Sequence, residues 1–237
     1  MKRTLILVLL ASLLTSIAQA QDDRPFRFGL HISPLIGWMK PDAQNYVADG
    51  GILNLNYGFS TEFMLAQNYT FATGIDFITM GGWLEYPDAL IINEGDPVAV
   101  EGTMFRKYKT QYLQLPLTIR MRTNEMGYLT FYGQFGFTAD FLLKAKADDE
   151  FDFQGSAQAD KVIRDDVDIQ DEISFFRAGM LIGLGAEYSL GGSTVLTAGI
   201  NFNNGFTDVL RGSNALNTKI EENAISNAIE LSLGVIF

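Results

Sequence analysis

The sequence predicts an all-β protein: an eight-stranded antiparallel up-and-down transmembrane β-barrel with short turns at one end and long loops at the other. Alternation of apolar with small or polar residues recurs about eight times along the chain, and the intervening connections are long and short in turn. One face of each alternating segment is rich in aromatics, whereas the other combines glycine with charge. With 237 residues, of which 47% are hydrophobic, the chain can form one domain with a sizeable core.

The N-terminus has the pattern of an export signal. Lys2 and Arg3 precede an apolar run over 5–14, which is followed by small and polar residues ending in Ala18-Gln19-Ala20. We therefore expect residues 1–20 to be a signal peptide and residues 21–237 to be the barrel domain. An uncleaved anchor helix is the alternative, but the run is shorter than the ~20 apolar residues that a spanning helix needs.

Composition excludes several classes of function. The 17 Lys and Arg against 28 Asp and Glu leave a net charge of −11, which argues against a nucleic-acid partner. The absence of cysteine excludes disulfides, thiolate metal sites and a cysteine nucleophile, and one histidine excludes His-rich metal clusters. We expect neither a cofactor nor a metal site.

The strands are expected in the following order. Alternating segments cover 28–33, 54–65, 69–77, 128–143, 176–188, 196–202 and 228–237, and a further strand containing Pro116 lies between the connections at 84–109 and 122–127. In the segment 54–65, Tyr57, Phe59 and Phe63 share one face, whereas Gly58 and Glu62 share the other. Pro34 and Pro116 cannot donate to a ladder, so each is expected at a bulge, a strand end or a place that tolerates the missing donor.

Connection lengths favour one kind of barrel. The long connections are 40–53, 84–109, 144–172 and 204–223, whereas the short ones are 66–68, 122–127 and 191–193. This places both termini at the end with short turns, which is the layout of an outer-membrane barrel with periplasmic turns and external loops. We therefore expect an outer-membrane location and contact with outer-membrane lipid.

The two strand faces decide between a membrane barrel and a soluble one. A soluble, lipocalin-like periplasmic carrier would place its aromatics inside, whereas a membrane barrel places them toward lipid. We expect the aromatic face outside and a structural charge network in the lumen, formed by Glu62, Asp76, Arg120, Asp140, Arg177, Glu187 and Glu230. Because a buried charge is costly unless paired, Arg120 and Arg177 should each reach two of these acids. A selective pore is the alternative, but eight strands leave room for little beyond side chains.

His31 and Ser33 are the residues that suggest hydrolase chemistry. They lie two apart on one strand face, as in outer-membrane lipid-modifying enzymes. Their alternation places them on the face of Gly29, which we assign to the lumen, whereas chemistry on lipid requires the bilayer side. A histidine that fills the barrel is the favoured interpretation.

The connection 144–172 is acidic. Asp166 and Asp168 resemble the start of a calcium loop, but the glycine turn of such a loop is missing. A solvated external loop is favoured over a calcium site. The acids of this connection are Asp148, Asp149, Glu150, Asp152, Asp160, Asp165, Asp166, Asp168, Asp171 and Glu172.

Several strings resemble the PorT-like outer-membrane β-barrel family of Gram-negative bacteria. They are Tyr112-Leu113-Gln114-Leu115-Pro116-Leu117, Tyr132-Gly133-Gln134-Phe135-Gly136, Phe141-Leu142-Leu143-Lys144-Ala145-Lys146 and Gly183-Leu184-Gly185-Ala186-Glu187-Tyr188. The resemblance covers most of residues 26–237 and implies the fold and the compartment more firmly than an activity. The member that names the family is implicated in type IX protein secretion.

The C-terminus resembles the signal that the barrel-assembly machinery recognises, with Leu233, Val235 and Phe237 on one face of the last strand. The resemblance implies that machinery as a partner during biogenesis, and such a strand can pair edge-on with an assembly factor. We expect a non-enzymatic outer-membrane barrel that offers its external loops to protein partners, as a scaffold or as an accessory to secretion. An outer-membrane lipid-modifying enzyme and the soluble carrier are the alternatives.

Overall fold

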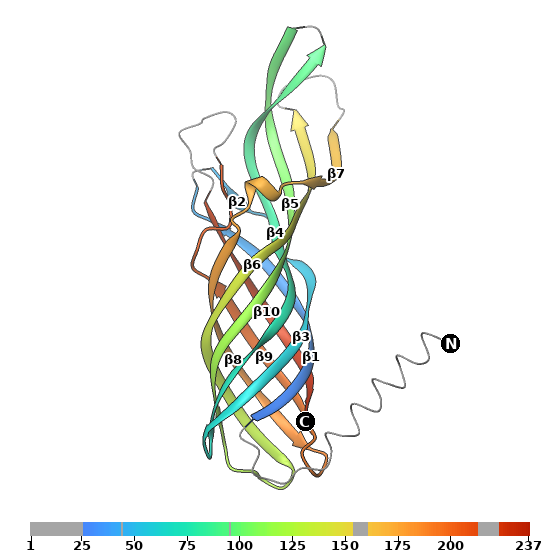
Figure 1. The fold of residues 1–237 in the computed structure, drawn as a ribbon. Coiled ribbons are helices and arrows are strands. Elements are labelled where there is room, and N and C mark those ends of the chain that lie inside the picture. The colour runs from blue at the N-terminus through green and yellow to red at the C-terminus, as the bar shows by residue number, and fades with distance from the viewer. Residues whose placement is uncertain (1–25, 44, 95, 154–160, 213–222) are drawn as a thin grey trace, which may run out of the picture.

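Eight strands close into a ring in a computed structural model that describes residues 26–43, 45–94, 96–153, 161–212 and 223–237. The strands of the ring are β1 (Phe26–Pro41), β3 (Ile52–Ala66), β4 (Tyr69–Glu94), β5 (Asp96–Arg122), β6 (Leu129–Phe153), β8 (Phe176–Ser189), β9 (Val195–Gly205) and β10 (Ala224–Ile236). Neighbours in the ring are antiparallel, and β1 pairs with β10 to close it (Figure 1). The predicted fold class is confirmed.

Three short elements of the described residues lie outside the ring. The two-residue strand β2 (Val47–Ala48) pairs with β4, and β7 (Val162–Asp168) pairs with β6. The 3-10 helix η1 (Gln170–Glu172) follows β7. Across the part of the chain that the structure describes, no helix has the length and apolarity needed to cross a membrane.

The strand faces point as the alternation predicts. Phe135 and Leu184 are 46% and 71% exposed on the outside, whereas Arg177 is fully buried inside. Large apolar side chains therefore cover the outer wall, and a barrel of this kind satisfies the hydrogen bonds of its backbone polar groups by closing the ring. The arrangement is the opposite of that expected for a soluble carrier with an apolar interior.

Both strand prolines lie at gaps in a ladder. Pro34 pairs with Leu55 of β3, but the β1–β10 register skips from Ile32 to Leu35. Pro116 pairs with Thr138 of β6, while the β4–β5 register has a gap of the same length around it. The register is the same on either side of each gap, so each proline lies where its missing donor is tolerated rather than at a bulge.

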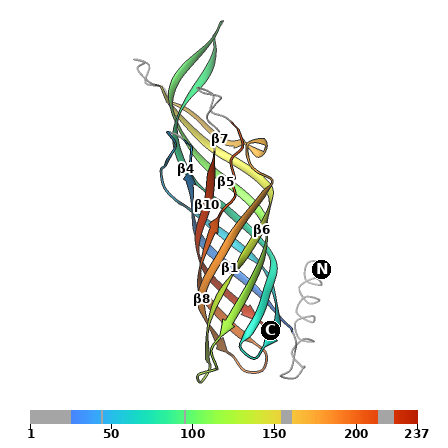
Figure 2. The same ribbon diagram turned by 90° about the vertical axis from the view of Figure 1, so that its left-hand side faces the viewer.

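Two of the predicted long loops are strands instead. β4 and β5 pair as far as Glu94 and Asp96, and β6 continues to Phe153 (Figures 1 and 2). The inward apolar alternation persists there, but most outward positions change from apolar or aromatic to polar or charged, so no continuous aromatic face marks the strand. We define the arm as residues 79–94, 96–111, 142–153 and 162–168, where pairing of β4 with β3 and of β6 with β8 has ended.

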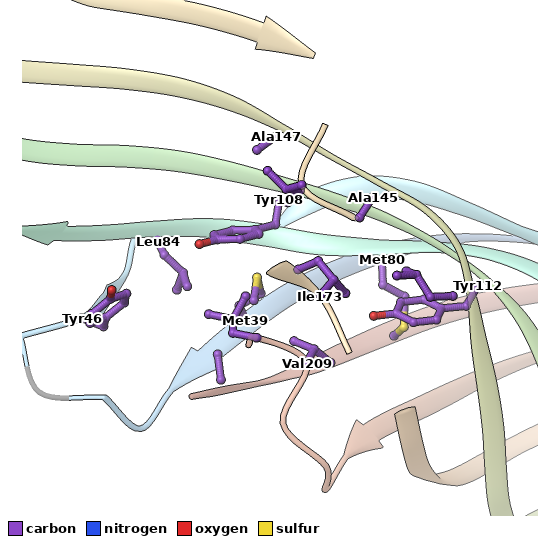
Figure 3. Close-up of a cluster of buried hydrophobic side chains, with 14 of the residues drawn as sticks. Met39, Tyr46, Met80, Leu84, Tyr108, Tyr112, Ala145, Ala147, Ile173 and Val209 are labelled. Atoms are coloured by element: carbon purple, nitrogen blue, oxygen red, sulfur yellow. The ribbon is translucent and has the colours of Figure 1, made fainter. Parts of the chain in front are cut away.

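An apolar cluster fills the interior where the barrel meets the arm. Figure 3 shows Met39 of β1, Met80 and Leu84 of β4, and Tyr108 and Tyr112 of β5 pointing toward one another. Ile169, Ile173, Val209 and Leu210, which follow β7 and β9, also belong to the cluster. The predicted lumen contained a charge network, and this apolar layer was not predicted. The cluster occupies the lumen beyond the charged residues with close-packed side chains.

Candidate functional site

A cluster of five charged residues occupies the turn end of the barrel interior. Glu62 of β3 accepts hydrogen bonds from Arg27 (2.6 Å), Arg122 (2.5 Å) and Arg120. Glu187 of β8 lies 2.9 Å from Arg122, 3.4 Å from Arg27 and 3.6 Å from Arg120. Both acids are almost fully buried, so each is paired as a buried charge requires. Arg120 thus reaches two of the expected acids.

Arg27 and Arg122 were missed by the sequence analysis. Arg27 lies two residues before Gly29 on the lumen face of β1, and Arg122 lies two residues after Arg120. Alternation alone could therefore have placed both inside. They were overlooked because they stand at strand ends, next to the short turns.

A second charged pair lies deeper in the lumen. Arg177 of β8 pairs with Asp140, its register partner on β6, and both are fully buried. The guanidinium also donates to Asn203 (2.9 Å) and to the hydroxyl (2.7 Å) and carbonyl (2.9 Å) of Ser226. The prediction of two acidic partners for Arg177 is wrong, because neutral oxygens from β9 and β10 take its remaining donors.

The remaining predicted lumen acids lie beside His31. Asp76 Oδ1 is 3.4 Å from His31 Nε2, and Glu230 accepts a hydrogen bond of 3.0 Å from Asn56. A cavity of about 80 Å³, lined by polar and apolar side chains, lies among these residues. Ser33 Oγ borders it and makes no hydrogen bond with any described residue. A cavity of this size with polar groups in its lining is large enough for water.

The geometry does not favour lipid chemistry at His31 and Ser33. Both residues line the interior cavity, and Ser33 is 1% exposed. A nucleophile acting on lipid has to reach the bilayer, which lies on the opposite side of the barrel wall. The lumen filler interpretation of His31 fits its contact with Asp76.

The acidic connection 144–172 is ordered by ion pairs and strands. Asp166 lies 3.2 Å from Lys146, and Asp168 accepts a hydrogen bond of 3.0 Å from the backbone of Gln170. The expected solvated loop is thus replaced, in its described part, by β6, β7 and η1; Asp160 lies outside the described residues. Within the described ranges, no three His, Asp or Glu side chains form a group suited to a metal ion.

A buried ion-pair network ties the arm together. Arg106 of β5 donates to Asp149 of β6 at 2.7 Å and to Glu172 of η1 at 2.6 Å. Burial, the largest effect, acts to lower the pKa of Arg106, but the hydrogen bond to Asp149 together with the Coulombic attraction of Tyr86, Tyr108 and Asp149 outweighs it, and the pKa lies above its ordinary value. On the outer face of the arm, Lys109 and the backbone N–H of Asp166 outweigh the effect of burial and hold the pKa of Asp148 below its ordinary value.

The C-terminal residues close the ring. Leu233 and Val235 lie in β10 and pair with Ile32 and Leu30 of β1. The backbone N–H of Phe237 donates to the carbonyl of Phe28 at 2.7 Å. The strand that resembles an assembly signal is therefore the strand whose pairing with β1 completes the barrel.

An apolar outer wall around a charged lumen defines a transmembrane β-barrel. The chain belongs to the family described as outer membrane protein beta-barrel domain, whose model matches residues 17–211. It is thus an outer-membrane protein. A comparison with curated proteins finds no match.

Several solved outer-membrane proteins are similar in structure. Neisserial surface protein A is 11% identical, with 91% of this chain and 98% of that chain covered and a TM-score of 0.45. OprG from Pseudomonas aeruginosa is 12% identical, with 92% and 99% covered and a TM-score of 0.40. Ail of Yersinia pestis is 11% identical, with 90% and 100% covered and a TM-score of 0.34.

Proposed function

We propose that this outer-membrane barrel is a non-enzymatic scaffold that presents its arm to protein partners outside the cell. The observation that carries the proposal is the continuous sheet of β4, β5, β6 and β7, which extends beyond the ring on the side away from the short turns (Figures 1 and 2). Short turns face the periplasm in barrels of this class, so the arm is external. Arg106 and the apolar cluster hold it as a rigid sheet rather than a set of loops.

The lumen is filled with side chains, which favours a scaffold function and argues against a pore. The turn end holds Glu62 and Glu187 with three arginines, and the arm end holds the apolar cluster. Side chains therefore occupy the interior at two levels. The inward position of Ser33 supports a non-enzymatic function over lipid modification.

The resemblance to the PorT-like family supports a more specific proposal, an accessory function in protein secretion. We also propose that the chain is exported with cleavage after Ala20 and is inserted into the outer membrane by the barrel-assembly machinery. N-terminal sequencing of the protein from outer membranes should find Gln21 first. A chain that begins at residue 1 would show that the leader is retained.

A shortened arm tests the scaffold. Asp88 and Gly102 are register partners on β4 and β5, so deleting residues 89–101 joins them as an Asp-Gly pair, which is favoured in two-residue hairpin turns. The deletion should retain the change of mobility on boiling in SDS gels that closed membrane barrels show, while reducing the quantity of secreted protein in the medium. A deletion of Gly192 in the turn between β8 and β9 is the control at the opposite end.

The outcomes are distinct. A folded deletion variant in the outer membrane with reduced secretion supports an external scaffold for secretion. Undiminished secretion by that variant would exclude the arm as the scaffold surface, and a band of the parent protein in the soluble fraction without heat-dependent mobility would exclude the membrane barrel itself.

A further inference from the structure

Four lysines gather on the outer face of the arm, at its base. Lys107 and Lys109 lie on β5, and Lys144 and Lys146 lie on the neighbouring strand β6. They are four of the eight lysines in a chain whose net charge is −11. Their alternation with the buried residues Tyr108, Ala145 and Ala147 directs them outward, away from the interior. We call these four residues the lysine patch.

The lysine patch begins where the apolar outer wall ends. On β5 the outward apolar residues run from Met121 to Leu113, a nine-residue stretch that matches the roughly 9–11 residues with which a strand spans the bilayer. On β6 the last outward apolar residue is Leu143, directly before Lys144. The side-chain nitrogen of Lys107 lies 5.4 Å from the ring of Trp83 on β4.

Tryptophan is enriched where membrane and water meet, and its position beside Lys107 marks that level on the arm. Because the arm is external, this level is that of the headgroups of the outer leaflet. The lysine patch therefore faces lipid headgroups rather than bulk water or acyl chains.

The lysine patch is only partly neutralised by the protein. Lys109 and Lys146 are direct register partners, and like charges in that relation destabilise a sheet. Asp148 lies 2.5 Å from Lys109, and Asp166 lies 3.2 Å from Lys146. Asp148 is also the register partner of Lys107, although it forms no close ion pair with it, and no acid among the described residues forms an ion pair with Lys144. A bound anion would offset the repulsion and supply a counter-charge for Lys144.

We propose that the lysine patch binds the phosphate groups of an outer-leaflet lipid headgroup. Lysine binds phosphate as a compact point charge, and clustered basic residues at a membrane surface bind anionic lipids. We infer that the bound anion is a lipid phosphate and not a soluble anion, because the lysine patch lies directly above Leu143 and beside Trp83, at the level of the headgroups. The inference rests on the proposed function only in requiring that the arm is external.

Fluorescence of Trp83 provides the test. The chain contains two tryptophans, so replacing Trp38 with Phe leaves Trp83 as the reporter beside the patch. The full chain with this replacement, folded in neutral detergent micelles, is titrated with diphosphoryl lipid A and separately with lipid A from which the phosphates have been removed. We expect saturable binding of the phosphorylated lipid that weakens as salt is raised.

Charge removal identifies the patch. A lysine near an anionic surface changes binding affinity by roughly fivefold. The triple replacement Lys109→Gln, Lys144→Gln and Lys146→Gln should therefore raise the lipid A concentration at half-saturation by on the order of tenfold or more. Lys161→Gln removes a lysine outside the patch, directly before β7, where its partner is Glu150 of β6, and should change binding less than about twofold. Arginine at the same three positions should restore binding, and heat-dependent mobility on SDS gels checks that each variant is folded.

Three results would overturn the proposal. They are equal binding by the triple glutamine variant and the parent, equal binding of phosphate-free lipid A, and an equal response to inorganic phosphate, which would indicate a soluble anion. The variant lacking residues 89–101 retains the lysine patch, so it should still bind lipid. Loss of secretion and loss of lipid binding can thus be told apart.

Discussion

Arg177 of β8 lies directly opposite Asp140 of β6 in the sheet register, and the two form an ion pair that is completely shielded from solvent. The arginine side chain crosses the lumen face of β9 and donates to Ser226 of β10 at 2.7 Å. One guanidinium thereby connects strands that lie on both sides of β9, and it does so near the end of the barrel from which the arm extends.

Replacing Arg177 with Met should destabilise the barrel by roughly 3–5 kcal/mol, because Asp140 would remain buried without its counter-charge. Urea unfolding in lipid vesicles, followed by tryptophan fluorescence, measures the effect. The double variant with Asp140→Asn should recover part of the loss. Additive losses in the two single variants and the double variant would show that the pair contributes no coupling energy.

Glu62 should matter more for stability than Glu187. Both acids face Arg27, Arg120 and Arg122, but Glu62 makes the shorter contacts with all three. Glu62→Gln leaves three arginines sharing one carboxylate and should cost about 3 kcal/mol, whereas Glu187→Gln should cost less. The heat-dependent transition on SDS gels ranks the two variants, and the reverse ranking would contradict the geometry.

Gly58 allows Asp76 to approach His31. His31, Gly58 and Asp76 are successive register partners on β1, β3 and β4, so the carboxylate lies over the glycine. A methyl group at residue 58 would meet Asp76 Oδ1 and lie 2.6 Å from the carbonyl oxygen of Ile75. Gly58→Ala should therefore cost about 1–3 kcal/mol.

Gly133 is the matched control for this replacement. It is also a strand glycine, but the nearest atom to an added methyl group, in Leu184, is 3.5 Å away. Gly133→Ala should change the free energy of unfolding by less than about 0.5 kcal/mol. Equal losses at the two positions would indicate a general effect of strand glycines instead of the specific contact.

Arg106 should control the rigidity of the arm. Arg106→Gln leaves the buried Asp149 without its charge partner and should cost about 2 kcal/mol, whereas Glu172→Gln should cost under about 1 kcal/mol because Glu172 is far more exposed. Limited proteolysis of the folded protein in vesicles measures this, with faster cleavage in the arm expected for Arg106→Gln. Cleavage as slow as in the parent would show that the apolar cluster alone holds the arm.

Local alternation predicted most of the wall. The segment 54–65 shows why: its period of two assigns Phe59 outward and Glu62 inward without any knowledge of neighbours, and burial agrees. The arm escaped prediction because its outward residues, such as Lys107 and Asp148, are charged. A strand above the membrane no longer needs an aromatic face, so the signal that identified the other strands is absent there.

The closure of the barrel determines which buried charged residues form ion pairs. Arg27 and Glu187 are 160 residues apart in sequence, yet they lie within hydrogen-bonding distance across the lumen. Alternation shows that both point inward, but their depth depends on the tilt of the strands and on the stagger at the β1–β10 closure. The same stagger gives Arg177 one acid rather than two. The sequence by itself determined the strand faces, the membrane class and the end with short turns, because these follow from a local period; the pairing of buried charges depends on the closure of the whole sheet.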